Sequence, residues 1–197
     1  MIHPSAGPPV LILASTSLYR RQLLDRLGLP YTVETPDVDE TPHSDESPAA
    51  LSERLARAKA TAISLRHPDA WVIGSDQVCE RDGIAVGKSA DHAIATTQLV
   101  AASGKAVRFH TAVCLQRGGI QHAHRDLTEV VFRVLDAAQI ERYLRAEQPY
   151  DCAGSFKCEG LGIVLFERID NQDPTALIGL PLIALARMLR SAGYRLP

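Results

Sequence analysis

The sequence lacks the features of a membrane-spanning or nucleic-acid-binding chain. No apolar run approaches the roughly 20 residues of a transmembrane helix. The formal net charge is -2, so there is no overall positive field, and aromatic residues are not interleaved with basic ones. The first ten residues, MIHPSAGPPV, have neither the basic stretch nor the apolar core of a signal peptide. We therefore expect a soluble cytoplasmic protein with no membrane or nucleic-acid partner.

Cysteine and lysine are both scarce. The 4 cysteines show no spacing typical of a metal site or a redox pair, which favours buried or incidental thiols. Arginine supplies most of the positive charge, and a codon-composition bias accounts for much of this. Each lysine still deserves inspection, because arginine could replace a lysine that only solvates the surface. The lysines are Lys59, Lys88, Lys105 and Lys157.

Strand-like and helix-like segments alternate along the chain, which indicates an α/β protein with a mixed sheet. No repeat, low-complexity segment or interdomain linker interrupts them, so we expect one domain over residues 1–197. An acidic, proline-rich loop is expected at 36–48 and a glycine-containing loop at 81–89. The patterns predict strands at 9–14, 31–34, 71–76, 105–116, 120–134 and 161–169, and helices at 17–28, 48–66, 90–102, 137–146 and 181–193.

Local signals support several of these boundaries. Ser47 followed by Pro48 is typical of a helix N-cap and first helical residue. Asp136 and Gln139 have the spacing of a capping box. The glycine pair at 118–119 lies between two strand-like runs and predicts a hairpin.

The stretch LILASTSLYRRQLLDRLGL, residues 11–29, places two arginines in the first turn of a helix. Cations are unfavourable there by roughly 0.3–1 kcal/mol each, because the helix N-terminus carries partial positive charge. A bound phosphate would reverse this, since free backbone N–H groups, serine hydroxyls and guanidinium groups all favour an anion. A serine N-cap followed by two solvated arginines explains the stretch equally well. The residues in question are Ser15, Ser17, Arg20 and Arg21.

Carboxylates and lysines elsewhere fit the same chemistry. The acidic loop could hold Mg²⁺ or Mn²⁺ through oxygen ligands, although most such loops are simply solvated. Asp76 is predicted at the end of a strand, where ligand sites of open α/β sheets lie, or where a carboxylate caps the next turn. Lys59 and Lys88, together with Arg20, could neutralise a polyphosphate. There is no GxxxxGK[ST] or GxGxxG motif, which excludes the common phosphate loops.

An ordered set of short motifs resembles the Maf family of nucleotide pyrophosphatases. The motifs span about residues 10–190: LILASTSLYRRQLLDRLGL, VDETPHSDESP, LARAKA, IGSDQV, VGKS, CAGSFKCEGLG and GLPLIAL. Within the family, SDQV and AGSFKCEG resemble the branch that hydrolyses 7-methyl-GTP rather than the branch that acts on dTTP and UTP.

The resemblance implies a mixed α/β fold with an elongated, twisted sheet, flanking helices and a cleft between two lobes. It implies cleavage of a nucleoside triphosphate between the α and β phosphorus atoms, with a divalent metal cation, Mg²⁺ or Mn²⁺, as cofactor. The nucleotide is the expected partner, and a homodimer stays open. A house-cleaning enzyme is the leading hypothesis, and a non-catalytic nucleotide-binding regulator of cell division is the alternative.

The resemblance also assigns roles to individual residues. Asp76 matches the proton acceptor and, with Glu40, the metal-binding positions. The phosphate-binding positions match Ser15, Arg20, Lys59 and Lys88, and the positions that separate substrate branches match Tyr19, Gln77 and Glu159.

The chain departs from the family pattern at three positions. Leu18 and Ser89 stand where proline is usual, and Tyr19 stands where tryptophan is common in this branch. Leucine loosens the first helical turn without removing a reactive group. Ser89 is expected to cap the following helix, which would preserve the local structure. The aromatic face of Tyr19 is smaller than that of tryptophan, which predicts weaker base stacking.

Overall fold

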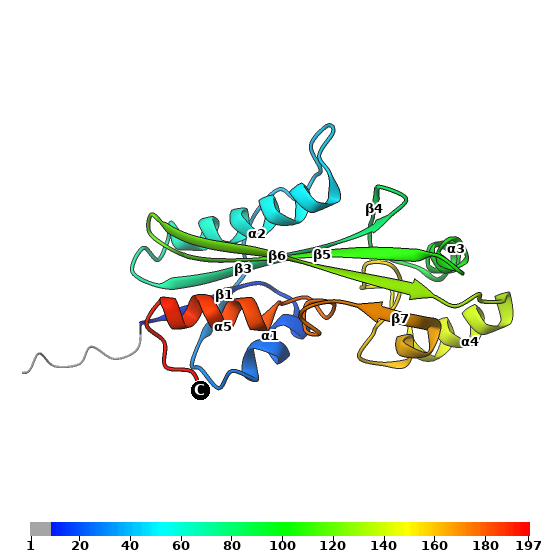
Figure 1. Ribbon diagram of the computed structural model, residues 1–197. Helices are drawn as coiled ribbons and strands as arrows, with labels where there is room; N and C mark the ends of the chain where they lie inside the picture. Colours follow the sequence, from blue (N-terminus) through cyan, green and yellow to red (C-terminus); the bar gives the residue numbers. More distant parts are fainter. Residues whose placement is uncertain (1–8) are drawn as a thin grey trace, which may run out of the picture.

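One twisted sheet runs the length of the elongated molecule, whose computed structural model describes residues 9–197 (Figure 1). The residues at 1–8, on which the expected lack of a leader partly rests, lie outside the described part. The 7-stranded sheet has the order β2-β1-β3-β5-β6-β7, and β4 pairs with β3. The strands are β1 (Leu11–Ala14), β2 (Thr32–Glu34), β3 (Trp71–Arg81), β4 (Ile84–Val86), β5 (Ala106–Arg117), β6 (Ile120–Phe132) and β7 (Phe166–Asp170).

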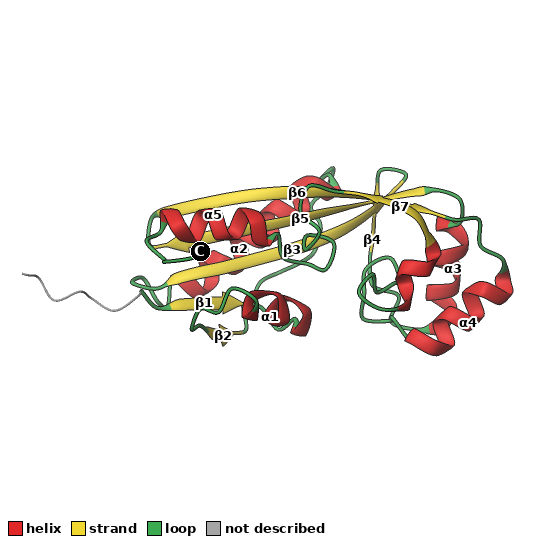
Figure 2. Cartoon of the chain, turned by 60° about the horizontal axis from the view of Figure 1, so that its bottom comes forward, coloured by secondary structure: helices red, strands yellow, loops and turns green. Residues whose placement is uncertain are grey.

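The helices gather in two lobes, as expected from the resemblance stated for the sequence. The first lobe carries α2 on one face of the sheet and α1 and α5 on the other (Figure 1). The second lobe gathers α3, α4 and a short 3-10 helix at the far end, beside β7 (Figure 2). The bounds are α1 (Leu18–Asp25), α2 (Pro48–Ser64), α3 (His92–Ala102), α4 (Ala137–Glu147), η1 (Leu161–Leu165) and α5 (Leu182–Ser191).

Each lobe has its own hydrophobic core, and both cores use side chains of the same long strands. Val113 and Leu115 of β5 pack under α1 and α5 in the first lobe. Val107 and Phe109 of the same strand pack against α3 and α4 in the second. β5 and β6 pair along their whole length around the turn at 118–119, so the predicted hairpin is confirmed. None of the helices within residues 9–197 has the length and apolarity of a membrane span.

The local signals at helix starts are confirmed. Ser47 caps α2 by accepting from the amide of Ala50, with Pro48 at the first helical position. Asp136 and Gln139 form the capping box of α4. The predicted cap at Ser89 is wrong: Asp91 caps α3 by accepting from the Ile94 amide at 2.8 Å. The hydroxyl of Ser89 is buried instead, with no hydrogen-bond partner in the described chain.

Two predicted segments differ from the structure near the middle of the chain. The strand expected to end at Asp76 continues to Arg81, because β5 pairs with it from Val72 to Glu80 and carries the ladder past polar residues. Asp76 therefore lies within the strand. The loop expected at 81–89 contains β4, which returns along β3 after a turn at Asp82-Gly83 with positive φ at both residues. Asp-Gly is a strong signal for such a two-residue hairpin.

The strand expected at 161–169 is also only partly correct. Its first half is the 3-10 helix η1, and β7 begins at Phe166. The reason lies at Gly162, whose amide donates to the carbonyl of Lys157 at 3.0 Å and holds the chain in a compact turn. An added Cβ at Gly162 would come within 3.0 Å of the Lys157 backbone, so the turn needs glycine.

The outer edge of β3 is paired at both ends and open in between. β1 pairs with β3 up to Gly74, and β4 pairs with it from Cys79 onward. Within the described residues, no strand pairs on this side with residues 75–78, although β5 covers the opposite edge throughout. Because side chains alternate along a strand, the side chains of Asp76 and Gln77 point to opposite faces of the sheet at this open edge.

Gly74 allows α2 to lie unusually close to the sheet. A Cβ at this position would be 2.5 Å from the amide nitrogen of Ala60 and closer still to the carbonyl oxygen of Ala56. Both obstacles are helix backbone, which cannot rotate away. The close approach of α2 also sets the distance between the sheet and Lys59, the residue before Ala60.

We expect Gly74→Ala to lower the free energy of unfolding by about 1–3 kcal/mol or more, because overpacking against backbone forces the helix outward. Urea unfolding followed by circular dichroism measures the loss. Gly119→Ala is the matched control, because nothing lies within 4 Å of its added Cβ and its φ is not positive. Equal stability of the two variants would contradict the close packing described here.

Candidate active site

A cleft opens at the unpaired edge of β3, between the two lobes. It consists of two adjoining cavities, the larger about 560 Å³ and the smaller about 140 Å³ in volume. The larger is lined by residues 15–20, 35, 36, 40, 59, 76, 77, 88 and 151. The smaller is lined by residues 17, 19, 20, 77, 88, 109, 151–153, 156, 158, 159 and 177–179.

The start of α1 supplies one wall of the larger cavity. Ser17 caps the helix by accepting from the amide of Arg20. The Arg20 side chain turns into the cleft, where its Nε donates to the carbonyl of Gly179 at 2.9 Å and its Nη1 lies 3.5 Å from Ser15 Oγ. Arg21 is exposed and does not line either cavity. Only the first of the two arginines therefore belongs to the cleft.

Three charged side chains meet on the face of the sheet covered by α2. Lys59 Nζ lies 2.6 Å from Asp76 Oδ1 and 2.7 Å from Glu40 Oε1. The side chains of Lys59 and Asp76 are only 8% and 11% exposed, whereas Glu40 is 61% exposed on the acidic loop. The buried pair is thus fixed by the fold, and Glu40 closes over it from the solvent side.

Burial and neighbouring charges shift the pKa of Glu40 and of Arg20. Partial burial raises the pKa of Glu40, but the hydrogen bond from Lys59 and the charges of Lys59, Lys88 and Arg20 outweigh it and hold that pKa below its ordinary value. Burial lowers the pKa of the Arg20 guanidinium, and the charges of Asp76 and Glu40 oppose that shift. The larger cavity therefore gathers cations around the carboxylates of Glu40 and Asp76.

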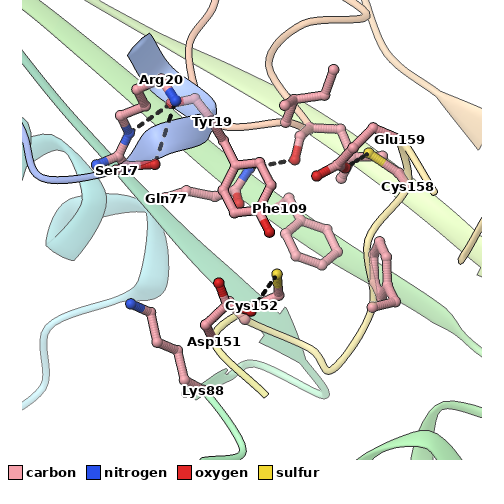
Figure 3. A pocket seen from close by; sticks show the side chains of 15 residues that line it. Ser17, Tyr19, Arg20, Gln77, Lys88, Phe109, Asp151, Cys152, Cys158 and Glu159 are labelled. Carbon is pink, nitrogen blue, oxygen red and sulfur yellow. Dashed lines mark hydrogen bonds between the residues drawn. The ribbon is translucent and has the colours of Figure 1, made fainter. Parts of the chain in front are cut away.

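The second lobe supplies the facing wall through two loops that are tied together. Lys88 forms an isolated antiparallel bridge with Ala153. The amide of Ala90 donates to the carbonyl of Tyr150 at 3.1 Å. These contacts hold Lys88 and Asp151 side by side at the mouth of both cavities, and both residues line each of them (Figure 3).

The smaller cavity lies on the opposite face of the sheet and contains Tyr19, Gln77 and Glu159. The Nε2 of Gln77 donates to Thr111 Oγ1 at 3.0 Å and to the carbonyls of Ala176 and Leu177 at 3.0 and 2.9 Å. Carbonyl oxygens only accept, so these contacts fix the orientation of the amide. Gln77 therefore offers its Oε1, an acceptor, to a ligand.

Tyr19 and two thiols complete the wall of the smaller cavity. Burial and the nearby side chains of Cys152 and Asp151 raise the pKa of Tyr19, so its hydroxyl stays neutral. Burial raises the pKa of Cys152 and of Cys158 to about 12, each helped by the neighbouring carboxylate, Asp151 or Glu159. Both thiols are protonated near neutral pH, which excludes a thiolate nucleophile.

A divalent metal fits the donor set of the larger cavity. Magnesium is commonly held by one or two carboxylates together with phosphate oxygens of a substrate. Glu40 and Asp76 supply two carboxylates that already converge on one cation, the ammonium of Lys59. Residues 9–197 contain no cluster of three or more His, Cys, Asp or Glu side chains placed to hold an ion by themselves. A metal here would need oxygens from a ligand.

The structure brings every site residue expected from the sequence to this cleft. Glu159 lines the smaller cavity. The larger one is lined by Ser15, Glu40, Lys59 and Asp76, and both are lined by Tyr19, Arg20, Gln77 and Lys88. Sequence reasoning did not single out Asp151, the carbonyls at 176–179, or the wall formed by Phe109 and Phe156. Cys152 and Cys158, interpreted as incidental, also lie there. Cys152, Phe156 and Cys158 lie in the family motif CAGSFKCEGLG, and Asp151 immediately precedes it.

Comparison with known proteins agrees with this architecture. Residues 10–192 match the Maf-like protein family. A Xanthomonas oryzae pv. oryzae protein named 7-methyl-GTP pyrophosphatase is 62% identical over 190 residues, which are 96% of this chain and 100% of that protein. Proteins of the same name from Cupriavidus metallidurans and Burkholderia pseudomallei are 56% and 54% identical. They cover 94% and 100% of this chain, and 94% of each relative is matched.

A solved Vibrio cholerae protein covers 96% of this chain and all of its own, at 15% identity and a TM-score of 0.42, too weak a likeness to carry an argument. The family match covers nearly the whole described chain, and the relatives match over nearly their full length. This chain belongs to the Maf-like protein family.

Proposed function

We propose that this protein hydrolyses 7-methyl-GTP to 7-methyl-GMP and pyrophosphate, as a house-cleaning enzyme for modified nucleotides. One observation carries the proposal: a single cleft holds a cation-rich cavity and a cavity with base acceptors on the two faces of one strand edge. A nucleoside triphosphate has this division of chemistry. The names of the relatives support the same reaction and the same base.

The phosphate end would bind in the larger cavity. Arg20, Lys59 and Lys88 provide positive charge from three different elements, and Ser15 adds a hydroxyl donor. Pyrophosphate is a highly charged leaving group, so cations are needed along the whole triphosphate. Arg20 is already oriented by Gly179 and Ser15, which reduces the ordering cost when phosphate binds.

Asp76 is the proposed proton acceptor. It would orient an attacking water and take its proton while the bond between the α phosphorus and its bridging oxygen breaks. The ion pair with Lys59 fixes the position of the carboxylate, with Oδ1 2.6 Å from the ammonium nitrogen. A bound divalent cation, Mg²⁺ or Mn²⁺, would supply Lewis-acid stabilisation of the phosphate charge, with Glu40 and Asp76 as its protein ligands.

The base end would bind in the smaller cavity. Methylation at N7 makes guanine cationic, and a cationic ring stacks well on the face of Tyr19. Glu159 and the Oε1 of Gln77 are acceptors for the N1–H and N2–H₂ edge of the base. The negative charge of Glu159 favours the methylated base over plain guanine, which has the same edge but no ring charge.

In the same proposal the protein is a single domain that acts in the cytoplasm. Its partner is a nucleotide and not a nucleic acid, and a homodimer is left open. The alternative function is a non-catalytic nucleotide-binding regulator of cell division. A pure sensor has no use for a buried carboxylate beside the phosphates, so Asp76 favours the enzyme.

The primary test is turnover of 7-methyl-GTP, GTP, dTTP and UTP with Mg²⁺ or Mn²⁺, measured by pyrophosphate release. We expect Asp76→Asn to lower kcat by about 100-fold or more, because the amide keeps the shape and loses the proton-accepting charge. Asp69→Asn changes an exposed carboxylate before β3 and should leave kcat unchanged. Wild-type binding without turnover of any of the four nucleotides would favour the regulator instead.

Arg20→Ala and Arg21→Ala form a matched pair on adjacent positions of α1. We expect Arg20→Ala to lower kcat/KM at least about tenfold, since a charge-assisted phosphate contact is lost. Arg21→Ala should stay within about threefold of wild type, because that side chain points about 100° away on the helix. Thermal melting of both variants checks that each is folded. An equal loss in the two variants would contradict the orientation of α1 proposed for phosphate binding.

Glu159→Gln tests base recognition. The wild type should prefer 7-methyl-GTP, and the variant should lose about 1–3 kcal/mol of that preference over GTP, the value of a charge-assisted bond. Measuring kcat/KM for both nucleotides with wild type, Glu159→Gln and the exposed control Glu167→Gln separates charge from general effects. If Glu159→Gln keeps the full preference, Glu159 has no role in selecting the base.

A further inference from the structure

Asp151 stands at the junction of the two cavities, where a bound nucleotide must pass from phosphate to base. Six residues line both cavities: Ser17, Tyr19, Arg20, Gln77, Lys88 and Asp151. Between the triphosphate and the base of any nucleotide lies the ribose, which offers hydroxyl donors and no charge. The junction therefore needs a hydrogen-bond acceptor that can receive a hydroxyl.

The other junction residues are a helix cap, cations, or residues already assigned to the base, namely Tyr19 and the Oε1 of Gln77. Ser17 Oγ accepts from the Arg20 amide as the cap of α1, and Gln77 is held by three acceptors around its nitrogen. Arg20 and Lys88 are cations and cannot accept a hydrogen bond. Among the junction residues, Asp151 is the only carboxylate, and carboxylates are strong acceptors for hydroxyl groups.

The position of Asp151 is fixed by its neighbours while its side chain stays accessible. Its backbone lies between Tyr150, whose carbonyl accepts from Ala90, and Ala153, which bridges to Lys88. Its side chain is 63% exposed in the cleft. Its two side-chain contacts in the described chain, Cys152 Sγ at 3.6 Å and Lys157 Nζ at 3.8 Å, both fall on Oδ1.

Charge also limits what Asp151 can contact. A carboxylate facing the triphosphate directly would repel it, so its presence beside Lys88 is favourable only toward a neutral donor or a cation. Figure 3 shows Asp151 beside Lys88 and Cys152, across the cavity from Arg20 and Ser17. The cationic base is placed deeper in the smaller cavity, against Tyr19 and Glu159. The part of the ligand at the junction of the two cavities is therefore the neutral sugar.

We infer that Asp151 accepts a hydrogen bond from a ribose hydroxyl and makes the enzyme selective for ribonucleotides over deoxyribonucleotides. The inference rests on the proposed function, because it uses the placement of triphosphate and base given above. Asp151 is then a specificity-determining residue that contacts the substrate and takes no part in the proton transfer.

The test compares kcat/KM for 7-methyl-GTP with its 2′-deoxy and 3′-deoxy counterparts. The wild type should prefer the ribonucleotide over at least one of them by about 10- to 100-fold, the value of a hydrogen bond to a charged group. Asp151→Asn should reduce that ratio to within about threefold, mainly through a rise in KM for the ribonucleotide. Asp82→Asn, in the exposed turn between β3 and β4, is the matched control and should keep the wild-type ratio.

The outcomes separate this inference from the proposed function. If the wild type does not hydrolyse 7-methyl-GTP, the proposed function fails. If it hydrolyses all three nucleotides equally well, only the role of Asp151 is overturned, and this comparison needs no variant. An equal loss on all three nucleotides in Asp151→Asn, or an increased Mg²⁺ requirement, would show a structural or metal-binding role and overturn the inference. The wild-type ratio retained in Asp151→Asn would also overturn it.

Discussion

The open stretch on the outer edge of β3 determines where everything else in the cleft lies. β1 ends beside Gly74 and the pairing with β4 starts at Cys79, so the residues between them have a neighbour strand on one side only. Asp76 and Gln77 leave this stretch toward opposite faces. One strand thus contributes adjacent side chains to two chemically different cavities, and a ligand that contacts both must cross the edge of the sheet.

The acidic and basic groups of the larger cavity depend on how closely α2 can approach that strand. Gly74 removes the side chain that would keep Ala56 and Ala60 away. Lys59 then reaches Asp76 at 2.6 Å in a nearly closed environment. A buried charge without a partner would be costly, and this packing places the Asp76 carboxylate and the Lys59 ammonium in contact.

Much of the fold and part of the cleft could be predicted from the sequence because the signals are local. The capping residues Ser47 and Asp136 and the glycine hairpin depend only on neighbours in the chain. The different orientations of Arg20 and Arg21 follow from helix geometry. The extent of β3 could not be predicted, since its polar second half is held by pairing with β5, far along the chain. The orientation of Gln77 depends on carbonyls a hundred residues away, which no local pattern reveals.

The two lobes share one sheet, and this has a mechanical consequence. β3 and β5 contribute side chains to both cores, and β5 and β6 exchange hydrogen bonds along their whole length (Figure 2). Narrowing the cleft would require bending this ladder across its middle, which costs far more than rotating about a linker. A continuous ladder therefore opposes rotation of one lobe against the other, so the relative placement of the two cavities is set by the sheet before any ligand arrives.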